Sequence, residues 1–500
     1  MSENIRTYQT RISQTFDTQL SEFAALMSRV EHCLFADIAK GNQPQALKSS
    51  YLTRFGITAR HFNAIRIKLE GKIDSIQQRS LQLIEQKKQQ IQALEENLSR
   101  IRDKKILHAK RRRLATLRHQ LSLLEKAKEQ KKVSLCFGSK KRFHAVFHLA
   151  ENGYSTHEEW KQEWQQARTN EIFLIGSQEE TSGNQSCTAT LAEDESIHLR
   201  IRLPDALNKD KYLLIPNVRF AYGHQAIVSA IRDCQLRRNL SLLKNPSYHS
   251  HGRPITFRFK RDHKGWRLFA SVAVVAPQPI TRENQGVIGV DINGDHLAIV
   301  ETDRFGNPIE KHTITLALQG KTKTQARALI ADASKKVITL SEATRKPLII
   351  ENLDFQKKKA ALREQDNKTA RRLSAFAYQA IHQHLKSRAV SKGVQVYSVN
   401  PAYTSLIGRV NYAKRYGLSI HHAAALCIGR RSLGLSEKMP SGQREIPDGK
   451  GDHVTLALPE RNRARHVWSQ WRQFSKKCSA ALTAHFRTKN RSSSSRKATL

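Results

Sequence analysis

The chain has 500 residues, of which 85 are Lys or Arg and 44 are Asp or Glu, so its formal net charge at pH 7 is +41. Such an excess of positive charge repels itself unless the partner is a polyanion, and nucleic acid is the commonest one. Hydrophobic residues make up 39% of the chain, which suits folded domains rather than a disordered basic tail. No apolar run approaches the ~18 residues of a membrane span, and the first residues lack a secretory signal pattern. We therefore expect a cytoplasmic, nucleoid-associated protein of a bacterium, with no membrane partner.

The cysteines predict neither disulfides nor a zinc site. No two of the six are close in sequence, so there is no pair with the spacing of a zinc ribbon. We expect reduced, mostly buried thiols and no zinc. The six are Cys33, Cys136, Cys187, Cys234, Cys427 and Cys478.

Residues 59–132 predict two helices, because the stretch contains no proline and its apolar residues recur at steps of three and four. The apolar seam fails over residues 103–113, so we expect an antiparallel hairpin joined near that basic stretch. Two interpretations remain open: the hairpin is a coiled coil that serves dimerisation, or it is an arm whose tip contacts nucleic acid. We therefore expect either a homodimer or a monomer. The tip cations either bind phosphates or remain solvated; they are Lys104, Lys105, Lys110, Arg111, Arg112 and Arg113.

The hydrophobic period changes after the hairpin. Short alternating segments separated by turn residues predict a small antiparallel β-barrel or sheet between about 133 and 280. The predicted strands are 197–204, 211–220, 254–262 and 266–275. Basic residues on outward positions serve either edge-strand solubility or a nucleic-acid groove; they are Arg200, Arg202, Arg258, Lys260 and Arg261.

The last segment predicts an α/β domain. Three consecutive strands are followed by alternating helices and strands, which is the element order of the RNase H-like fold. The strands are 287–293, 296–303, 308–316, 346–355 and 394–401, and the helices lie near 321–343, 371–392 and, as the last, 419–433. The polar residues 490–500 predict a disordered tail.

Two carboxylates end predicted strands of this domain. Asp291 alone could cap a turn, but Glu351 at the end of a buried strand is harder to explain as packing, because burying Glu costs much free energy. If the two strands are neighbours, both carboxylates meet at one edge of the sheet. Two such groups could hold a pair of Mg2+ ions, one activating water and the other stabilising the leaving oxygen of a phosphodiester.

These residues also carry a resemblance to a known family. Three segments of the last domain resemble the RuvC motifs of TnpB-type transposon-encoded nucleases and type V CRISPR effectors. Two earlier segments are similar to the TnpB-related branch of that family. The first set is GVDINGDHLAIVETDRFGNP, KPLIIENLDF and VNPAYTS, and the second is CFGSKKRFHAVFHLAENGYSTHEEW (136–160) and GSQEETSGNQSC (176–187).

The resemblance implies an RNA guide, a DNA target and a multidomain α/β architecture: an RNase H-like (RuvC) domain, a small wedge β-barrel and a helical recognition insert. The implied ranges are 1–14 and 133–280 for the wedge barrel, 15–132 for the helical insert with its coiled-coil hairpin, 286–489 for the RuvC domain and 490–500 for the tail.

The third metal ligand departs from the family pattern. The family has an Asp at the start of a helix, after a zinc ribbon; here His421 takes that register position, and residues 406–417 replace the ribbon without a cysteine. Histidine suits Mn2+ better than Mg2+, so Mg2+ or Mn2+ is the expected cofactor. His422 points about 100° further around the helix and is the less favoured ligand. The alternative is that His421 only caps or stacks on the helix and the site is inactive.

Other charged groups near the predicted site have two interpretations each. A solvated surface is the default, whereas contact with the DNA strand is expected beside a site that cleaves phosphodiesters. Tyr403 could stack on a base or simply pack. The basic residues are Lys357, Lys358, Lys359, Arg430 and Arg431.

Four nearby acidic residues have other interpretations. We expect Asp295 and Asp354 to be turn residues or partners of the two ligands rather than ligands. Asp448 and Asp452 lie in a glycine-bearing loop and are weaker candidates to replace the missing carboxylate, because loop residues are imprecise ligands.

The sequence thus predicts an RNA-guided DNA endonuclease with catalytic residues Asp291, Glu351 and His421. A nuclease-inactive RNA-guided repressor or targeting factor is the alternative, and a nucleic-acid chaperone built on the coiled arm is a weaker one.

Overall fold

The computed structural model describes residues 3–98, 101–130, 132–180, 182–207, 210–275, 277–352, 375–449, 451–460, 464 and 466–495. The chain divides into two compact units. The first unit consists of Met1–Lys87 and Ala115–Val275, and the second of Lys88–Leu114 and Ala276–Leu500. Over the described ranges, no helix combines the length and the apolar character needed to cross a membrane.

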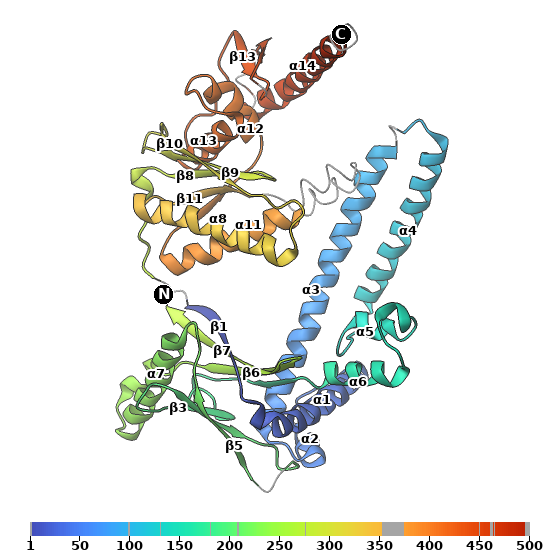
Figure 1. Ribbon diagram of the computed structural model, residues 1–500, viewed down its shortest axis with the longest axis vertical. Coiled ribbons are helices and arrows are strands. Elements are labelled where there is room, and N and C mark those ends of the chain that lie inside the picture. Colours follow the sequence, from blue (N-terminus) through green and yellow to red (C-terminus); the bar gives the residue numbers. More distant parts are fainter. Residues whose placement is uncertain are drawn as a thin grey trace. The chain divides into compact units, whose positions relative to one another are not determined.

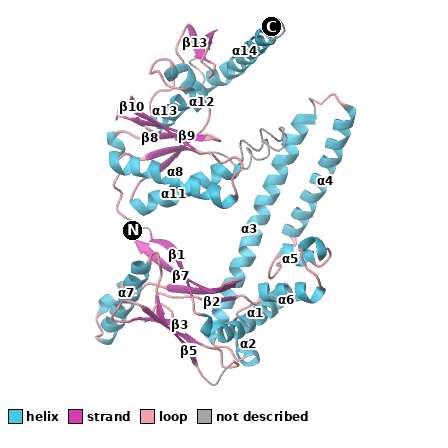
Figure 2. Ribbon diagram, in the orientation of Figure 1, coloured by secondary structure: helices cyan, strands magenta, loops and turns pink. Residues whose placement is uncertain are grey.

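The first unit contains two antiparallel sheets (Figure 2). The four-stranded sheet has the order β1-β7-β6-β2, and the three-stranded sheet has the order β3-β4-β5. All four predicted strands are present, but the described strands form two separate sheets rather than one closed barrel. The strands are β1 (Glu3–Arg11), β2 (Glu171–Leu174), β3 (Cys187–Leu191), β4 (Ile197–Arg202), β5 (Tyr212–Val218), β6 (Ile255–Asp262) and β7 (Gly265–Val275).

Helices accompany both sheets, including α5, α6 and α7 inside the range predicted to form a β-barrel or sheet. Helix α7 forms because Ile227, Ile231 and Cys234 recur at helical spacing and are buried in the core. The helices of this unit outside the hairpin are α1 (Asp17–Ala39), α2 (Lys48–Phe55), α5 (Lys140–Ala145), α6 (His157–Arg168), α7 (His224–Leu242) and the short 3-10 turns η1 (Gln14–Phe16), η2 (Ala150–Asn152) and η3 (Pro246–Ser250).

The predicted hairpin is present as α3 (Ala59–Leu98) and α4 (Lys104–Glu129), which run antiparallel (Figure 1). Lys87 Nζ of α3 donates to Gln120 Oε1 of α4 at 2.5 Å. The basic stretch expected near the turn instead forms the first half of α4. Asp103 caps this helix by accepting from the backbone N–H groups of Lys105 and Ile106, and the Lys, Arg, Ala and Leu residues that follow are strong helix formers.

The second unit has the predicted RNase H-like strand order. Its sheet runs β10-β9-β8-β11-β12, with the first three strands antiparallel and β8, β11 and β12 parallel. The elements are β8 (Ile288–Ile292), β9 (His296–Thr302), β10 (Pro308–Thr315), α8 (Lys323–Thr344), β11 (Leu348–Glu351), α11 (Ala375–Lys392), β12 (Val396–Val399) and α13 (Ile420–Ser432), after a turn η4 (Glu283–Gln285).

Helices cover both faces of this sheet (Figure 1). Helices α8 and α11 pack on one face, and α13 packs on the other. The backbone of α13 lies directly against β8 at Gly289, where an added Cβ would come within 2.0 Å of the Ala425 carbonyl oxygen. This close approach places the first turn of α13 near the end of β8 that carries Asp291.

The sequence predicts that α13 is the last helix, and this prediction is wrong. A β-hairpin and a long helix follow it, and this helix includes residues 490–495 of the predicted disordered tail. Trp471 and Phe474 of the added helix are fully buried in a core shared with α13, so apolar packing stabilises this helix. The remaining elements are α12 (Thr404–Ile407), the π-helical turn η5 (Gly408–Ala413), β13 (Gln443–Pro447), β14 (His453–Ala457) and α14 (Val467–Ser495).

Candidate active site

Asp291 and Glu351 lie at the same edge of the RNase H-like sheet. Strands β8 and β11 are parallel, and each carboxylate directly follows the paired residues Val290 and Ile350. Tyr378 of α11 is influenced by both: burial raises the pKa of its phenol, and the negative charges of Asp291 and Glu351 raise it further, to about 12. The sheet therefore brings the two predicted carboxylates together.

The Asp291 carboxylate is buried, with 7% of its surface exposed, and is held by two polar side chains. Asn293 Nδ2 donates to Asp291 Oδ2 at 2.9 Å, and His421 Nδ1 lies 3.3 Å from the same oxygen. Among the described residues, no lysine or arginine forms an ion pair with Asp291. The structure thus brings His421 to Asp291, as the register predicts.

His296 is a site residue that sequence reasoning missed. Its ring meets the His421 ring edge-on, with centroids 4.8 Å apart, and its Nε2 lies 3.4 Å from Asn293 Nδ2. Its Nδ1 is 2.7 Å from Asp295 Oδ1, and this hydrogen bond lowers the pKa of the Asp295 carboxyl. The available signal was the tight turn after Asp291, which returns the chain at the start of β9 and places position 296 beside the site.

A hydroxyl holds Glu351. Thr404 Oγ1 of α12 donates to Glu351 Oε1, and Thr404 is 1% exposed. Thr404 follows Tyr403, whose backbone is left-handed with φ +60° and ψ +10°, an unfavourable conformation for a residue with a large side chain. Tyr403 packs against the core around α13 rather than projecting as a free stacking ring. The strained turn therefore directs the Thr404 hydroxyl to Glu351.

His422, the other predicted ligand, faces β10 instead of the carboxylates. Its Nδ1 lies 2.8 Å from Ser419 Oγ, and its Nε2 lies 3.1 Å from both Thr313 Oγ1 and the His312 carbonyl oxygen. Burial lowers the pKa of this imidazole. Both ring nitrogens are engaged there, so the structure does not bring His422 to the site.

The donor chemistry at the sheet edge fits a divalent cation in part. Two carboxylates supply the oxygen donors that Mg2+ and Mn2+ prefer. However, no group of three or more His, Cys, Asp and Glu side chains in the described part of the chain is arranged to hold a metal ion. His421 bonds to Asp291 rather than standing as an independent third donor.

Two arginines of the second unit that we predicted to contact the DNA strand are bonded within the protein instead. Arg430 donates to the Tyr412 hydroxyl at 3.0 Å and to the Gly306 carbonyl at 2.7 Å. Arg431, half-buried, pairs with Glu437 and donates to the carbonyls of the loop before Thr404. Both arginines therefore stabilise the fold. Lys357, Lys358, Lys359 and Asp354 lie outside the described residues.

The acidic loop residues Asp448 and Asp452 lie beside a histidine of α14. His485 Nε2 is 3.6 Å from Asp448 Oδ2 and 3.5 Å from Asp452 Oδ2. Both carboxylates of this β13–β14 loop therefore face His485.

A basic groove of about 1190 Å³ lies within the first unit, between α1, α3, α6, β2 and β6. The predicted Arg258, Lys260 and Arg261 all line it. Acidic partners neutralise part of it: Lys68 Nζ lies 3.1 Å from Glu31 and 2.8 Å from Glu171. The basic lining residues are Lys68, Lys72, Arg142, Arg168, Arg258, Lys260, Arg261 and His263.

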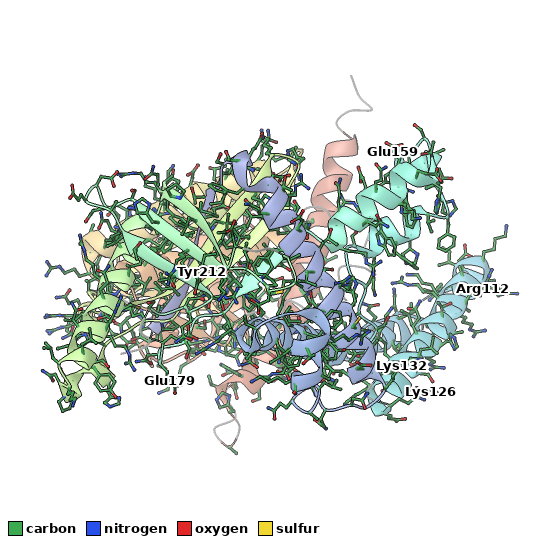
Figure 3. The ribbon with its side chains drawn as sticks, turned by 90° about the horizontal axis from the view of Figure 1, so that it is seen from below. Arg112, Lys126, Lys132, Glu159, Glu179 and Tyr212 are labelled. Atoms are coloured by element: carbon green, nitrogen blue, oxygen red, sulfur yellow. The ribbon has the colours of Figure 1, made fainter. Side chains whose placement is uncertain are left out.

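The other predicted basic residues are not in this groove. Arg200 lies over the Tyr212 ring at 4.6 Å, and Arg202 is tied to the Leu203 carbonyl at 2.6 Å and to Asp205 (Figure 3 labels Tyr212). On α4, Lys104, Lys105, Arg111 and Arg112 are exposed, with Arg112 projecting outward (Figure 3), whereas Lys110 and Arg113 are partly buried.

The chain shows distant similarity to several solved structures. No family model and no curated protein matches the chain. Among solved structures, a Cas12f1 complex with guide RNA and target DNA matches 85% of this chain and 99% of its own, at 10% identity and a TM-score of 0.32. RuvC of Thermus thermophilus matches 30% of this chain and 96% of its own, at 15% identity and a TM-score of 0.23. Cas12i in complex with crRNA and DNA matches 72% of this chain and 60% of its own, at 9% identity and a TM-score of 0.26.

Proposed function

We propose that the chain is an RNA-guided DNA endonuclease that hydrolyses phosphodiester bonds with Mg2+ or Mn2+ at Asp291, Glu351 and His421. One observation carries the proposal: Asp291 and Glu351 follow paired residues of adjacent parallel strands in an RNase H-like sheet. The motif resemblance and the +41 charge support the same conclusion.

The chain's own residues orient the two acidic groups. Asn293 donates to one oxygen of Asp291 and Thr404 to one oxygen of Glu351, which orients both carboxylates. His421 is held between Asp291 and the edge of the His296 ring. When bound, divalent cations would activate water and stabilise the leaving oxygen. Asp291 and Glu351 would balance the cation charge, and His421 would add a nitrogen donor.

Guide RNA and target DNA are the proposed partners. In this class of mechanism, base pairing between guide and target reads the sequence, while the protein holds the backbones and reads a short flanking motif. The groove of the first unit offers guanidinium and ammonium groups for phosphates.

A second candidate is an RNA-guided binding protein that does not cut. The observation that favours it is the position of His421, which bonds to Asp291 and completes no three-residue metal cluster in the described ranges. Such a protein would act as a repressor or targeting factor through occupancy alone.

The deciding experiment uses protein purified with its co-expressed RNA and a plasmid carrying a matched target, in Mg2+ or Mn2+. We expect cleavage by the wild type, none by Asp291→Asn, and wild-type cleavage by Asp332→Asn, an exposed carboxylate of α8 that serves as the control. Cleavage that survives Asp291→Asn contradicts the endonuclease assignment. Matched binding without cleavage by the wild type supports the second candidate, and absence of a specific bound RNA contradicts both.

A further inference from the structure

Two phenylalanines are exposed on α5 and the turn that follows it. Phe143 is 42% exposed and Phe147 is 68% exposed, and their ring centroids lie 6.5 Å apart in an edge-to-face arrangement. Exposing two large rings together loses the free energy that their burial would provide, so a partner for them is expected. We call Phe143 and Phe147 the aromatic platform.

The platform is held rigidly. The indole N–H of Trp160 donates to the Arg142 carbonyl at 2.7 Å and ties α5 to α6. Phe143 also contacts Trp164, at 6.2 Å between centroids, and Trp164 stacks on Trp160. Phe143 is therefore positioned against α6 before a partner binds, which lowers the conformational-entropy cost of ordering that ring.

The rim of the platform is positively charged. Lys140, Lys141 and His144 are exposed beside the two rings. Among the described residues, neither lysine forms an ion pair. The acidic groups nearby already have partners: Glu163 accepts from the Tyr154 hydroxyl at 3.0 Å and pairs with Arg142 at 3.4 Å.

The platform adjoins the basic groove of the first unit. Arg142, which precedes Phe143, and Glu163, which precedes Trp164, both line that groove. A strand whose phosphates followed the groove would therefore pass directly beside the two rings.

We propose that the aromatic platform stacks unpaired bases of the RNA that the protein carries, while Lys140 and Lys141 contact the adjacent phosphates. Exposed aromatic rings beside cations suit nucleobases, because every base offers a π-face and a neighbouring negative charge. The choice of RNA over DNA rests on the proposed function, in which RNA is the resident partner. A protein ligand would need the apolar rings but not the basic rim.

The test compares Phe147 variants in the full-length, RNA-bound Asp291→Asn protein, which cannot cleave under the proposed function. Cells grown with 4-thiouracil supply photoreactive RNA, and irradiation followed by mass spectrometry maps the crosslinked peptides. Filter binding of short oligouridine and duplex DNA to the same proteins, after their RNA has been removed, gives the affinities of the vacated platform. The variants are Phe147→Ala, Phe147→Leu and Phe147→Tyr, and Phe305→Ala, an equally exposed phenylalanine of the second unit, is the control.

We expect crosslinks within residues 139–148 and about tenfold weaker oligouridine binding by Phe147→Ala and Phe147→Leu. Phe147→Tyr and Phe305→Ala should bind like the parent. Full binding by Phe147→Leu would overturn stacking, since Leu keeps the apolar surface without the π-system. Crosslinks confined to other segments, or duplex DNA bound as tightly as oligouridine, would overturn the assignment to unpaired RNA bases. Absence of copurified RNA refutes the proposed function instead, and the oligouridine affinities still decide the platform.

Discussion

Buried carboxylates in the two units are held in different ways. In the first unit, Glu31 is 4% exposed and accepts from Lys68 at 3.1 Å and Lys72 at 2.5 Å. In the second unit, Asp291 is 7% exposed but is bonded to an amide and an imidazole. Taking a carboxylate out of water is costly unless an opposite charge compensates it.

The difference separates structural carboxylates from those available to a cation. It does not simply follow the unit, because Glu301, in the same sheet as Asp291, is fully compensated by buried Lys346 at 2.6 Å. Among the described residues, an amide and an imidazole orient Asp291, and no lysine or arginine pairs with it. A divalent cation would supply the missing positive charge, which is why this edge of the sheet, and not the groove, is the candidate metal site.

The largest contrast is expected from two matched substitutions. Glu351→Gln should lower cleavage by about 10³-fold or more, because a metal ligand contributes several kcal/mol to the transition state, and should barely change the melting temperature. Glu171→Gln should do the reverse: it leaves Lys68 and Arg258 without their shared partner and should cost about 3 kcal/mol of stability. Plasmid cleavage and thermal melting of both variants measure this. A stability loss for Glu351→Gln as large as that for Glu171→Gln would break the distinction.

The pH dependence of unfolding should show that Lys68 and Arg258 compensate the charge of partly buried Glu171. Burial acts to raise the pKa of Glu171, but the charge and hydrogen bond of Lys68 and the charge of Arg258 outweigh it and lower the pKa to about 2. The lowered pKa stabilises the fold above the ordinary value of 4.5, and this contribution is lost as the pH falls from there toward 2. We expect about 3 kcal/mol less stability at the acid end, measured by denaturant unfolding of the first unit. Glu171→Gln should flatten the curve; an unchanged slope in this variant would assign the effect to other carboxylates.

Substitution of His421, the third predicted metal ligand, should have an intermediate effect on cleavage. His421→Ala should lower cleavage by about 10- to 100-fold, since His421 contacts Asp291 and is the only nitrogen donor proposed there. His421→Asp should restore cleavage and shift its preference from Mn2+ toward Mg2+, because carboxylate oxygen suits Mg2+ better. Cleavage rates in each metal, together with metal titration of the RNA-bound protein, measure both changes, and exposed His453→Ala is the control. If His421→Ala cleaves as well as the wild type, histidine plays no part in the site.

Much of the second unit was predictable, because β8, β9 and β11 are mostly apolar runs and its helices are bounded by turn residues. The carboxylates followed from strand ends, and His421 from register. The short turn after Asp291 was a signal for the place of His296, but its ring contact with His421 depends on tertiary packing. The role of Arg431 was not predictable, because its burial depends on tertiary partners such as Glu437. Helix α7 did have a signal in the helical spacing of Ile227, Ile231 and Cys234.

The smallest effect expected concerns the hydroxyl that holds Glu351. Thr404→Val keeps the shape of the side chain but removes the donor to Glu351 Oε1, so the carboxylate gains freedom and the affinity for metal should fall about tenfold. Thr404→Ser retains the hydroxyl and should restore binding, whereas Ser405→Ala, an exposed neighbour on the same turn, should have no effect. Titration of Mn2+ into the RNA-bound protein, followed by electron paramagnetic resonance, measures the affinity without relying on cleavage. Equal affinities for the Val and Ser variants would mean that the strained turn at Tyr403 positions Glu351 through the backbone alone.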